Sequence, residues 1–479
     1  MKISDFPLFG SVFFILGILF SQLPKKFLLI SLLFFFFVFF KKKSLALTLF
    51  SFFIFFLGIL RYQLFVESLK VPNLPYFEKI EVVGVIVEPP EIREKYQRLV
   101  FKSSDLGKKF LIFTSPYQNF DFGDEIKVFG NLEPLDETKK YFLKDKILGI
   151  FYFPKIELLS KSKNFSIFSS FLSRVYNLKK FLENSVDENF QFPYSFLLKA
   201  ITLGEKEEMP SSLKDILNNS GLRHITAISG LHITILSAIL YDFLLSIGFW
   251  RHHSFYFSTI FIFAYLAMLG WQISALRAAI FGLLFGFSQI IGREILLERM
   301  IFYTAAFLLF LNPLLLTEDI SFQLSFASIL GINYFFSFFR EILNFSKNKI
   351  YHSFLNTFSM SLGALIFSGP LLFYHFGKLP VAALITNLLV IPILPYLLSL
   401  SFLFFLFALI FPSLSRIFSL ICFPFLFFIV FVAKFFSENF PLIELKISVF
   451  QLFISYFFLF LAAFKIKQEK RLKFFQLPF

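Results

Sequence analysis

Cysteine is nearly absent from the sequence, and charged residues are scarce. Cys422 is its one cysteine, so it offers neither an intrachain disulfide nor a thiolate metal site. Charged residues make up 16% of the chain, whereas hydrophobic residues make up 57% and mean hydropathy is +0.73. This balance predicts a polytopic α-helical membrane protein.

Acidic residues are also fewer than basic ones. The chain has 32 Asp plus Glu against 46 Lys plus Arg, a formal net charge of +14. Positive charge can attract a polyanion, but membrane topology alone requires Lys and Arg clusters between apolar segments. The 82 phenylalanines are spread through every apolar run, where we expect them to fill lipid-facing and core positions. Composition by itself therefore does not establish nucleic-acid binding.

Three apolar segments open the chain and define a first predicted domain, residues 1–62. They run from Pro7 to Gln22, from Lys26 to Phe40 and from Ser44 to Leu60. No signal-peptide cleavage pattern follows the first, so we expect it to remain in the mature protein. The cluster at Lys41 to Lys43 should be cytoplasmic, which places the N-terminus inside and the chain after Leu60 outside.

Residues 76–160 change in composition and contain short β-rich runs separated by turn residues. The runs are EVVGVIVEP, QRLVFKS, KKFLIFTS, GDEIKVFGNL and ILGIFYFPKIELL. Five such runs predict a small OB-like β-barrel inserted outside the cytoplasm. OB barrels often bind single-stranded nucleic acid, but Glu78 to Glu157 contains 13 Lys plus Arg and 14 Asp plus Glu. A structural or gating role and direct strand binding therefore both stay open.

Residues 161–220 are predicted to form amphipathic or interfacial helices and a polar connector. Ser166 to Phe190 has apolar positions at helical spacing with its charges on another face, which is typical of a helix on the membrane surface. The polar connector follows at Gly204 to Ser220 and leads into a second apolar region.

Residues 221–465 are predicted to form a second membrane domain, followed by a basic cytoplasmic tail at 466–479. With the connector outside, nine crossings place each Lys-bearing or Arg-bearing loop and the tail inside. One span is too long and contains Pro392 and Pro395, so we expect a half-helix followed by a full helix there. Pro370 is a further predicted helix break. The expected spans are Gly221 to Phe249, Ser254 to Leu269, Ile273 to Ile291, Leu296 to Leu316, Ile320 to Phe339, Ser353 to Phe376, Pro380 to Phe411, Leu414 to Phe436 and Ile447 to Lys465.

The segment GLRHITAISGLHITIL, residues 221–236, places polar groups where hydrocarbon would surround them. His224 and His232 are about 80° apart around a regular helix, so they would not face one ligand. Ser229 and Gly230 between them could break the helix and aim backbone amides into the bundle. Each histidine is either satisfied by a neighbouring carbonyl or in contact with a transported group. A metal site is not expected, because no third ligand sits at suitable spacing.

Three further ionisable residues lie in apolar surroundings. Arg277 in SALRAAIFG demands an anion or a carboxylate, and Glu318 and Asp319 in TEDISFQLSF demand a cation or an interfacial position. Pairing among them would lock the bundle, whereas separate roles would mark a pathway. Asp319 could also cap the helix that is predicted to start near Ile320.

Four sequence segments occur in an order and at a spacing that resemble the ComEC competence family, the membrane channel of bacterial DNA uptake. They are ITLGEKEEMPSSLKDILNNSGLRHITAISGLHITIL, SALRAAIFG, LNPLLLTEDISFQLSFASILGI and SGPLLFYHFGKLPVAALITNLLVIPILP. Together they cover most of Ala200 to Leu398. The three preceding spans and the β domain are similar to the N-terminal region of that family, which is described as OB-like.

This resemblance implies a multi-pass protein of the bacterial inner membrane that passes single-stranded DNA into the cytosol during transformation. The resemblance also implies that the residues matching the family's motif positions line the path of the DNA. We add Lys378 to these residues, because a DNA strand needs cations spaced along its phosphates. The expected pathway residues are His224, Ser229, Gly230, His232, Arg277, Asp319, Gln323, Ser325, Lys378 and Asn387. No catalytic role is implied for any of them.

Longer family members carry a C-terminal metallo-β-lactamase-like domain that is considered a nuclease. This sequence ends at Phe479 and has no HxHxDH-type motif, so we expect a short form that is not an enzyme and needs no metal or cofactor. The resemblance implies single-stranded DNA and the lipid bilayer as partners. A separate nuclease, a DNA receptor and a cytosolic motor or strand-binding protein would complete the system, because the sequence has no Walker-type phosphate loop.

A second class of function competes with this interpretation. A secondary transporter or flippase for a small or lipid-linked anion would also use an interrupted helix and a buried arginine. Inverted internal repeats would favour it, and the sequence shows no convincing repeat.

Overall fold

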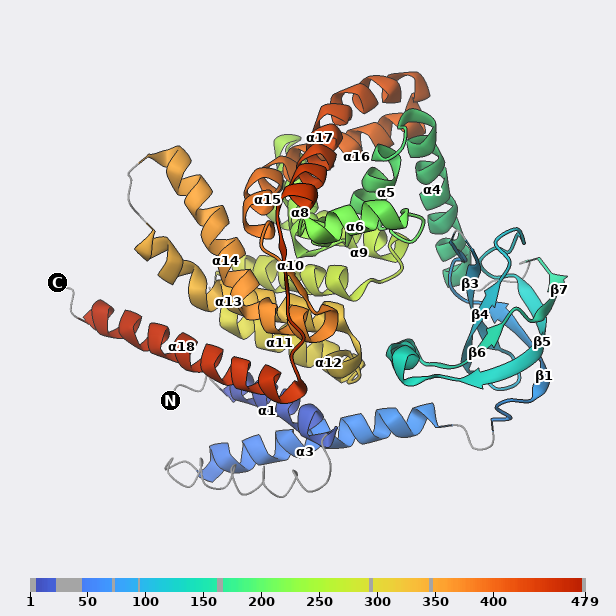
Figure 1. Cartoon of the computed structure of the whole chain (residues 1–479), viewed down its shortest axis with the longest axis horizontal. Helices are drawn as coiled ribbons and strands as arrows, with labels where there is room; N and C mark the ends of the chain where they lie inside the picture. The colour runs from blue at the N-terminus through green and yellow to red at the C-terminus, as the bar shows by residue number, and fades with distance from the viewer. Residues whose placement is uncertain are drawn as a thin grey trace. The chain divides into compact units, whose positions relative to one another are not determined.

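The computed structural model describes residues 6–22, 45–70, 74–93, 95–161, 167–292, 296–343 and 348–475. The chain divides into two compact units (Figure 1). Unit 1 comprises residues 1–173 and 294–323, and unit 2 comprises residues 174–293 and 324–479. Helices α4 (Ile167–Asn189) and α13 (Ile320–Ile342) run from one unit into the other.

The helical part of unit 1 packs through phenylalanine rings. It contains α1 (Phe6–Ser21), α3 (Leu45–Leu69), α11 (Leu297–Leu311) and α12 (Leu315–Glu318). The ring centroids of Phe20 and Phe55 are 5.9 Å apart, and those of Phe14 and Phe310 are 6.4 Å apart. Arg61 donates to the carbonyl oxygens of Phe310 and Leu311 at 2.7 and 3.0 Å, which satisfies the C-terminal end of α11. The expected span from Lys26 to Phe40 and the cluster at 41–43 lie outside the described residues.

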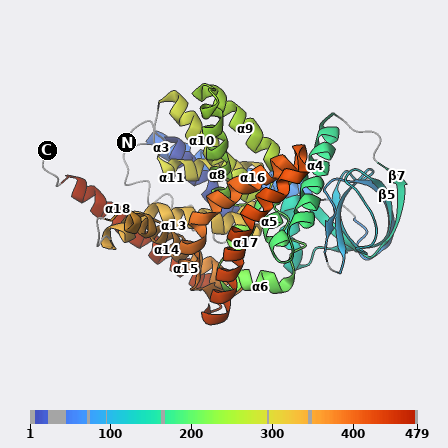
Figure 2. The same cartoon turned by 90° about the horizontal axis from the view of Figure 1, so that it is seen from above.

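The rest of unit 1 is a closed β-barrel, as the five β-rich runs separated by turn residues predicted. Its strands are β1 (Lys79–Ile86), β3 (Gln97–Ser103), β4 (Lys109–Thr114), β5 (Glu125–Pro134) and β6 (Ile147–Tyr152). They pair in the order β1, β3, β4, β6, β5, and β5 pairs back onto β1. The β4 and β6 pair is parallel and the other pairs are antiparallel. This is an OB-like arrangement, and Figure 2 shows the strands curling around one axis.

The barrel interior is filled by apolar side chains from every strand. Leu99, Phe101, Phe110, Ile112 and Phe151 are fully buried there. Each such side chain contributes roughly 1.5–3 kcal/mol by leaving water, so the barrel has its own core. Two more strands, β2 (Glu91–Ile92) and β7 (Lys155–Ser160), extend the sheet beside β3 and β5. A 3₁₀ helix, η2 (Glu137–Asp145), connects β5 to β6.

Unit 2 is a helical bundle. Each expected apolar stretch from 221 to 465 contains a helix, although the stretch from Leu296 to Leu316, with α11, belongs to unit 1. After α4 come α5 (Tyr194–Leu203), α6 (Ser211–Asn219), α7 (Arg223–Thr226), α8 (Gly230–Ser246), α9 (Arg251–Met268) and α10 (Ile273–Ile291). After α13 come α14 (Lys349–Phe376), α15 (Ala383–Val390), η3 (Ile391–Ile393), α16 (Leu394–Ile410), α17 (Pro412–Asn439) and α18 (Val449–Phe475). A short β8 (Lys378–Pro380) and β9 (Leu442–Glu444) pair beside them.

Six of the described helices are long and apolar enough to cross a membrane, so the chain is a multi-pass membrane protein. Shorter apolar helices, including α1, α8 and α10, occur beside them. The six are Leu49–Leu69, Ile320–Ile342, Tyr351–Phe376, Ala383–Ile410, Pro412–Asn439 and Val449–Gln468.

The expected proline breaks have different outcomes. Pro392 lies in η3, where the helix changes from α15 to α16 through one turn of 3₁₀ helix. Pro395 lies in the first turn of α16, where its missing N–H is tolerated. The prediction of a break at Pro370 is wrong, because α14 continues through it to Phe376. A proline inside a helix removes one main-chain bond, and neighbouring packing can hold the helix together.

A close helix crossing holds α13 against α14. A Cβ atom on Gly331 would lie 2.2 Å from the Gly363 carbonyl oxygen and 2.7 Å from the Phe367 Cβ. No larger side chain fits between the two backbones. Small residues at such crossings let membrane helices approach closely, where dispersion and weak polar contacts hold them.

Two ion clusters join α4, α5 and the polar connector in unit 2. Lys199 is buried with its ammonium between Asp187 and Glu208, at 2.9 and 3.0 Å. Lys179 lies between Glu183 and Glu205, at 3.4 and 3.2 Å. Burial without such partners would be costly for either lysine, so these contacts fix the connector to the helices.

Glu183 gives a prediction for the pH dependence of stability. Burial raises the pKa of its carboxyl group to about 7, from an ordinary value of 4.5. An acid with a raised folded-state pKa is fully tolerated below its unfolded pKa and destabilises the fold as pH rises through the higher value. Glu183→Gln should therefore make the free energy of unfolding fall less between pH 4.5 and pH 8 than it does in the unaltered protein, because a neutral side chain has no ionisation to oppose folding. Thermal unfolding in detergent at both pH values checks this.

The matched control is Glu188→Gln, on the exposed face of the same helix. It should shift the unfolding midpoint little at either pH. An equal fall of the midpoint between pH 4.5 and pH 8 in Glu183→Gln and in the unaltered protein would contradict the prediction.

Candidate functional site

The helix is broken before Gly230, which is one of the two arrangements that Ser229 and Gly230 left open in the sequence. α7 ends at Thr226, Ala227 to Ser229 are not helical, and α8 begins at Gly230. The Ser229 N–H donates to His232 Nδ1 at 3.3 Å, and Ser229 Oγ lies 2.9 Å from the same nitrogen. Because the backbone N–H is always a donor, Nδ1 accepts and the neutral ring carries its proton on Nε2. His232 is therefore part of the cap of α8.

Two neighbouring helices hold this segment in place. Ser274 at the start of α10 donates to the Ile228 carbonyl at 2.6 Å. Thr386 on α15 donates to the Ser220 carbonyl at 2.9 Å. Both contacts satisfy carbonyl groups of non-helical backbone, which is the condition for keeping such backbone within apolar surroundings. The start of α8 therefore has a fixed position against α10.

Arg277 lies one turn further along α10, against the first residue of α8. Its Nη2 atom lies 3.3 Å from the point where a Cβ atom on Gly230 would stand. The guanidinium carbon is 5.6 Å from the centre of the Phe326 ring on α13. The side chain is 4% exposed, so the positive charge is almost completely removed from solvent.

Arg277 is without a carboxylate partner among the described residues of its own unit. No Asp or Glu oxygen of unit 2 that the structure describes lies within 4.0 Å of its guanidinium. Its Nε and Nη1 atoms are buried and make no hydrogen bond. Asp319, one of the carboxylates that the sequence left open as a partner, pairs with Lys144 within unit 1. An unpaired buried guanidinium is costly in a stable fold and typical of a site that receives an anion.

The other polar residues of the segment are less closely joined to Arg277. His224 is exposed, and its Nδ1 lies 2.9 Å from the Gly221 carbonyl oxygen. Asn387 on α15 has a buried side-chain oxygen that makes no hydrogen bond. Ser325 lies one position before Phe326 on α13. Lys378 is an exposed residue of β8 and pairs with Glu444 of β9 at 2.9 Å.

Asp319 and Gln323 belong to unit 1, where they have structural contacts. The Phe322 N–H donates to Asp319 Oδ1 at 2.9 Å, so Asp319 caps α13. Its other carboxylate oxygen accepts from Lys144 of η2 at 2.7 Å, and the Asp319 side chain is 3% exposed. Gln323 donates to the carbonyl oxygens of Leu316 and Thr317. These contacts tie the barrel to the helices of unit 1.

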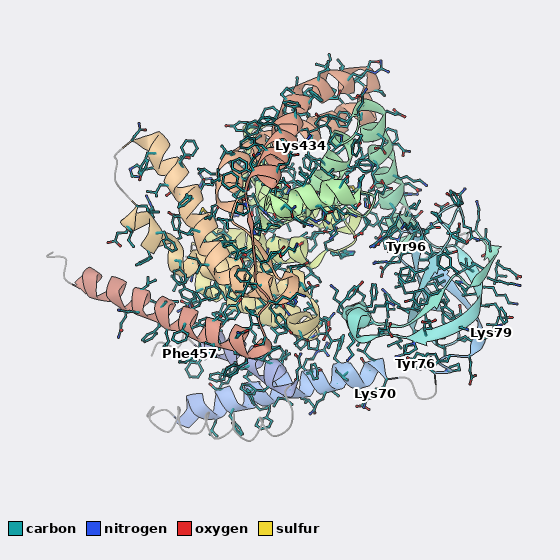
Figure 3. All side chains as sticks on the ribbon, viewed as in Figure 1. Lys70, Tyr76, Lys79, Tyr96, Lys434 and Phe457 are labelled. Atoms are coloured by element: carbon teal, nitrogen blue, oxygen red, sulfur yellow. The ribbon has the colours of Figure 1, made fainter. Side chains whose placement is uncertain are left out.

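The barrel carries a row of three aromatic rings: Tyr96 immediately before β3, Phe113 on β4 and Tyr152 on β6. The Tyr96 and Phe113 centroids are 5.2 Å apart, and the Phe113 and Tyr152 rings stack at 5.4 Å with an angle of 8°. A cation lies at each end, because Arg93 is 5.5 Å from the Tyr96 ring and Lys139 is 5.0 Å from the Tyr152 ring. Tyr96 is labelled on the barrel in Figure 3. We call these three rings the aromatic row.

A match to a protein family covers the helical bundle. Residues 201–469 match the family described as Competence protein, which is more than half of the chain. The chain belongs to the Competence protein family. The match begins in α5 and extends into α18, so it includes both the α8 segment and Arg277.

Named relatives of this Competence family chain include ComE operon protein 3 of Bacillus subtilis (strain 168). It is 24% identical over 318 residues, which is 65% of this chain and 38% of the relative. Recombination protein 2 of Haemophilus influenzae is 24% identical over 42% of this chain and 27% of the relative. The chain thus aligns with well under half of the length of these relatives. No solved structure matches the chain.

Several contacts in this Competence family chain could not be predicted from its sequence. Ser274, Phe326 and Thr386 position the α8 segment and Arg277, yet each looks like an ordinary residue of an apolar helix. The Lys144 contact joins residues 175 positions apart. The alternation of the strands could have suggested an aromatic face, but strand register was needed to bring Phe113 opposite Tyr152.

Proposed function

We propose that this chain forms the inner-membrane passage through which single-stranded DNA reaches the cytosol during natural transformation. The observation that carries the proposal is the family match over residues 201–469, which contains a buried arginine without a carboxylate partner. The names of the relatives, an operon protein and a recombination protein, are consistent with a role in handling incoming DNA.

The chemistry of both units suits a single DNA strand. A strand carries one negative charge per phosphate and presents an aromatic face with every base. Arg277 and the positive end of α8 offer an anion site in unit 2. The aromatic row in unit 1 offers stacking surfaces with a cation at either end. Neither feature requires a particular base sequence, as expected for uptake of arbitrary DNA.

The proposed pathway includes the residues with polar groups in the bundle. Ser229, Gly230 and His232 would present the start of α8, with Arg277 beside them and Asn387 contributing its unbonded oxygen. His224, Ser325 and Lys378 would contact the strand in passing. Asp319 and Gln323 would act indirectly, since their side chains hold Lys144 and the end of α12.

In the proposed topology the barrel lies outside the cytoplasm and both termini lie inside, as the positive-inside rule predicts. A Tyr117→Cys variant should react with a membrane-impermeant maleimide in intact spheroplasts, because Tyr117 is 91% exposed on the barrel. The native Cys422 is buried, so the unaltered protein should not react with the maleimide and serves as the control. Labelling of position 117 only after the cells are lysed would contradict this orientation.

The channel is proposed to act without catalysis of its own and with partners. Directed movement requires energy, and the sequence has no phosphate loop to bind a nucleotide. A DNA receptor, a separate nuclease and a cytosolic motor or strand-binding protein would therefore supply delivery, strand separation and pulling.

The proposal is tested by deleting the gene in its own transformable host and measuring labelled DNA separately in the periplasm and the cytosol. We expect DNA to accumulate outside the cytoplasmic membrane and to fall at least tenfold in the cytosol. Cytosolic DNA at the level of the unaltered strain would refute the channel. That result would favour the second function, transport of a small or lipid-linked anion, which the unpaired Arg277 and the interrupted α15 and α16 also suit.

A further inference from the structure

The start of α8 has the electrostatic character of an anion site. The first main-chain bond of this 17-residue helix runs from the Ile233 N–H to the Ser229 carbonyl, so the N–H groups of Gly230 and Leu231 precede it. Such leading N–H groups have no acceptor within the helix. They carry about half a positive charge at the helix end and commonly bind phosphate or carboxylate groups.

A second feature points to the same place independently. Arg277 comes from another helix, is 4% exposed, and has two buried nitrogens without partners. Its third nitrogen, Nη2, stands beside Gly230, the first residue of α8. Two positive groups side by side repel each other in apolar surroundings, so the arrangement is stable when an anion lies between them or next to them.

The neighbouring groups limit the chemistry of that anion. The guanidinium is planar and lies near the Phe326 ring, which leaves its edge for a partner with paired oxygens. Gly230 has no side chain, so an oxygen can approach the main-chain N–H closely. Ser229 Oγ is beside His232 Nδ1 rather than directed to a ligand by any other contact. A tetrahedral monoanion with two free oxygens fits these donors.

We propose that Arg277 and the N-terminus of α8 bind one phosphodiester group of the passing strand. This inference rests on the proposed function, because it names the group of the DNA that the bundle recognises. One guanidinium and one helix end balance a single negative charge, so the site would hold each phosphate in turn and release it to the next. Recognition of the backbone alone explains passage without base preference.

The test measures DNA binding by the purified full-length chain in nanodiscs of phosphatidylcholine. The probe is a fluorescent 20-nucleotide oligothymidylate, compared with the same oligomer carrying neutral methylphosphonate linkages. Arg277→Gln should weaken binding of the charged oligomer by about 10-fold to 100-fold, since hydrogen bonds to charged groups contribute about 1.5–3 kcal/mol. It should also reduce the slope of log affinity against log salt by about 0.7, the value for one phosphate of a single strand.

Two further variants separate a binding role from a folding role. Arg277→Lys keeps the charge but not the paired donors, so its affinity should lie between those of the other two proteins. Gly230→Ala places a methyl group 3.3 Å from Nη2 and should weaken binding several-fold with the salt slope unchanged. The matched control is Arg340→Gln, which removes an exposed arginine that also lies over a phenylalanine ring, at 6.0 Å from Phe336.

The outcomes are distinct from those of the gene deletion. Equal affinity and equal salt slope for Arg277→Gln and the unaltered chain would overturn the phosphodiester site, even if deletion abolishes uptake. An Arg277-dependent loss for the charged oligomer alone would support the site, even if deletion leaves uptake intact. Phosphatidylglycerol retained by the unaltered chain but not by Arg277→Gln in native mass spectrometry, with equal DNA affinity, would show that a lipid headgroup is the ligand instead.

Discussion

Cells that carry Arg277→Gln are expected to deliver about 10-fold to 100-fold less DNA to the cytosol than cells with the unaltered chain. The reason is the loss of a buried, unpaired positive charge beside the start of α8, where a phosphate would lose about 1.5–3 kcal/mol of interaction. The measurement is the cytosolic fraction of labelled transforming DNA, with the amount of protein in the membrane determined by immunoblot.

Arg340→Gln is the control for this effect, because it removes the same charge from an exposed position on α13. It should leave uptake within a factor of two of the unaltered chain. Normal uptake in Arg277→Gln at normal protein levels would remove Arg277 from the pathway.

The second large effect is expected on the barrel. Replacing both Tyr96 and Tyr152 by alanine should weaken binding of single-stranded DNA by the full chain by about 30-fold to 20,000-fold, since stacking contributes about 1–3 kcal/mol per base and two rings are removed. The two rings stand on either side of Phe113 and are flanked by Arg93 and Lys139. Fluorescence anisotropy with the purified chain measures the affinity.

Tyr117→Ala is the matched control, because its ring is 91% exposed on the same barrel and lies outside the aromatic row. Its affinity should equal that of the unaltered chain. If the double variant also binds normally, the barrel has a structural or gating role, which is the alternative that its nearly neutral composition allows.

The barrel could be predicted because the signals for its strands and turns lie in short stretches of sequence. Each of its five strands lies in a short run rich in β-forming residues, and turn residues separate the runs, so the fold class follows from the pattern. The strand pairs that close the barrel could not be predicted in this way. The parallel pairing of β4 with β6 and the pairing of β1 with β5 join strands that are distant in sequence, and only the structure supplies their register.

The sequence allowed a helix break at Ser229 and Gly230, because both residue types are favoured at helix starts. The surroundings of Arg277 could not be predicted from the sequence. Whether a buried arginine meets a carboxylate depends on which helices become neighbours, and Asp319 pairs with Lys144 of the barrel instead. At Pro370 the local sequence was misleading. Proline favours a helix break, but α14 continues through this position because packing with its neighbours holds the helix together.

The most direct test of the pathway is photocrosslinking of a labelled incoming strand to single positions in cells taking up DNA. A benzophenone amino acid at Thr234, exposed on α8 one turn beyond Gly230, should crosslink to the strand. The same group at Phe457, which is 62% exposed on α18 and labelled in Figure 3, should not. Equal crosslinking at both positions, or crosslinking at Phe457 alone, would contradict a path along the start of α8.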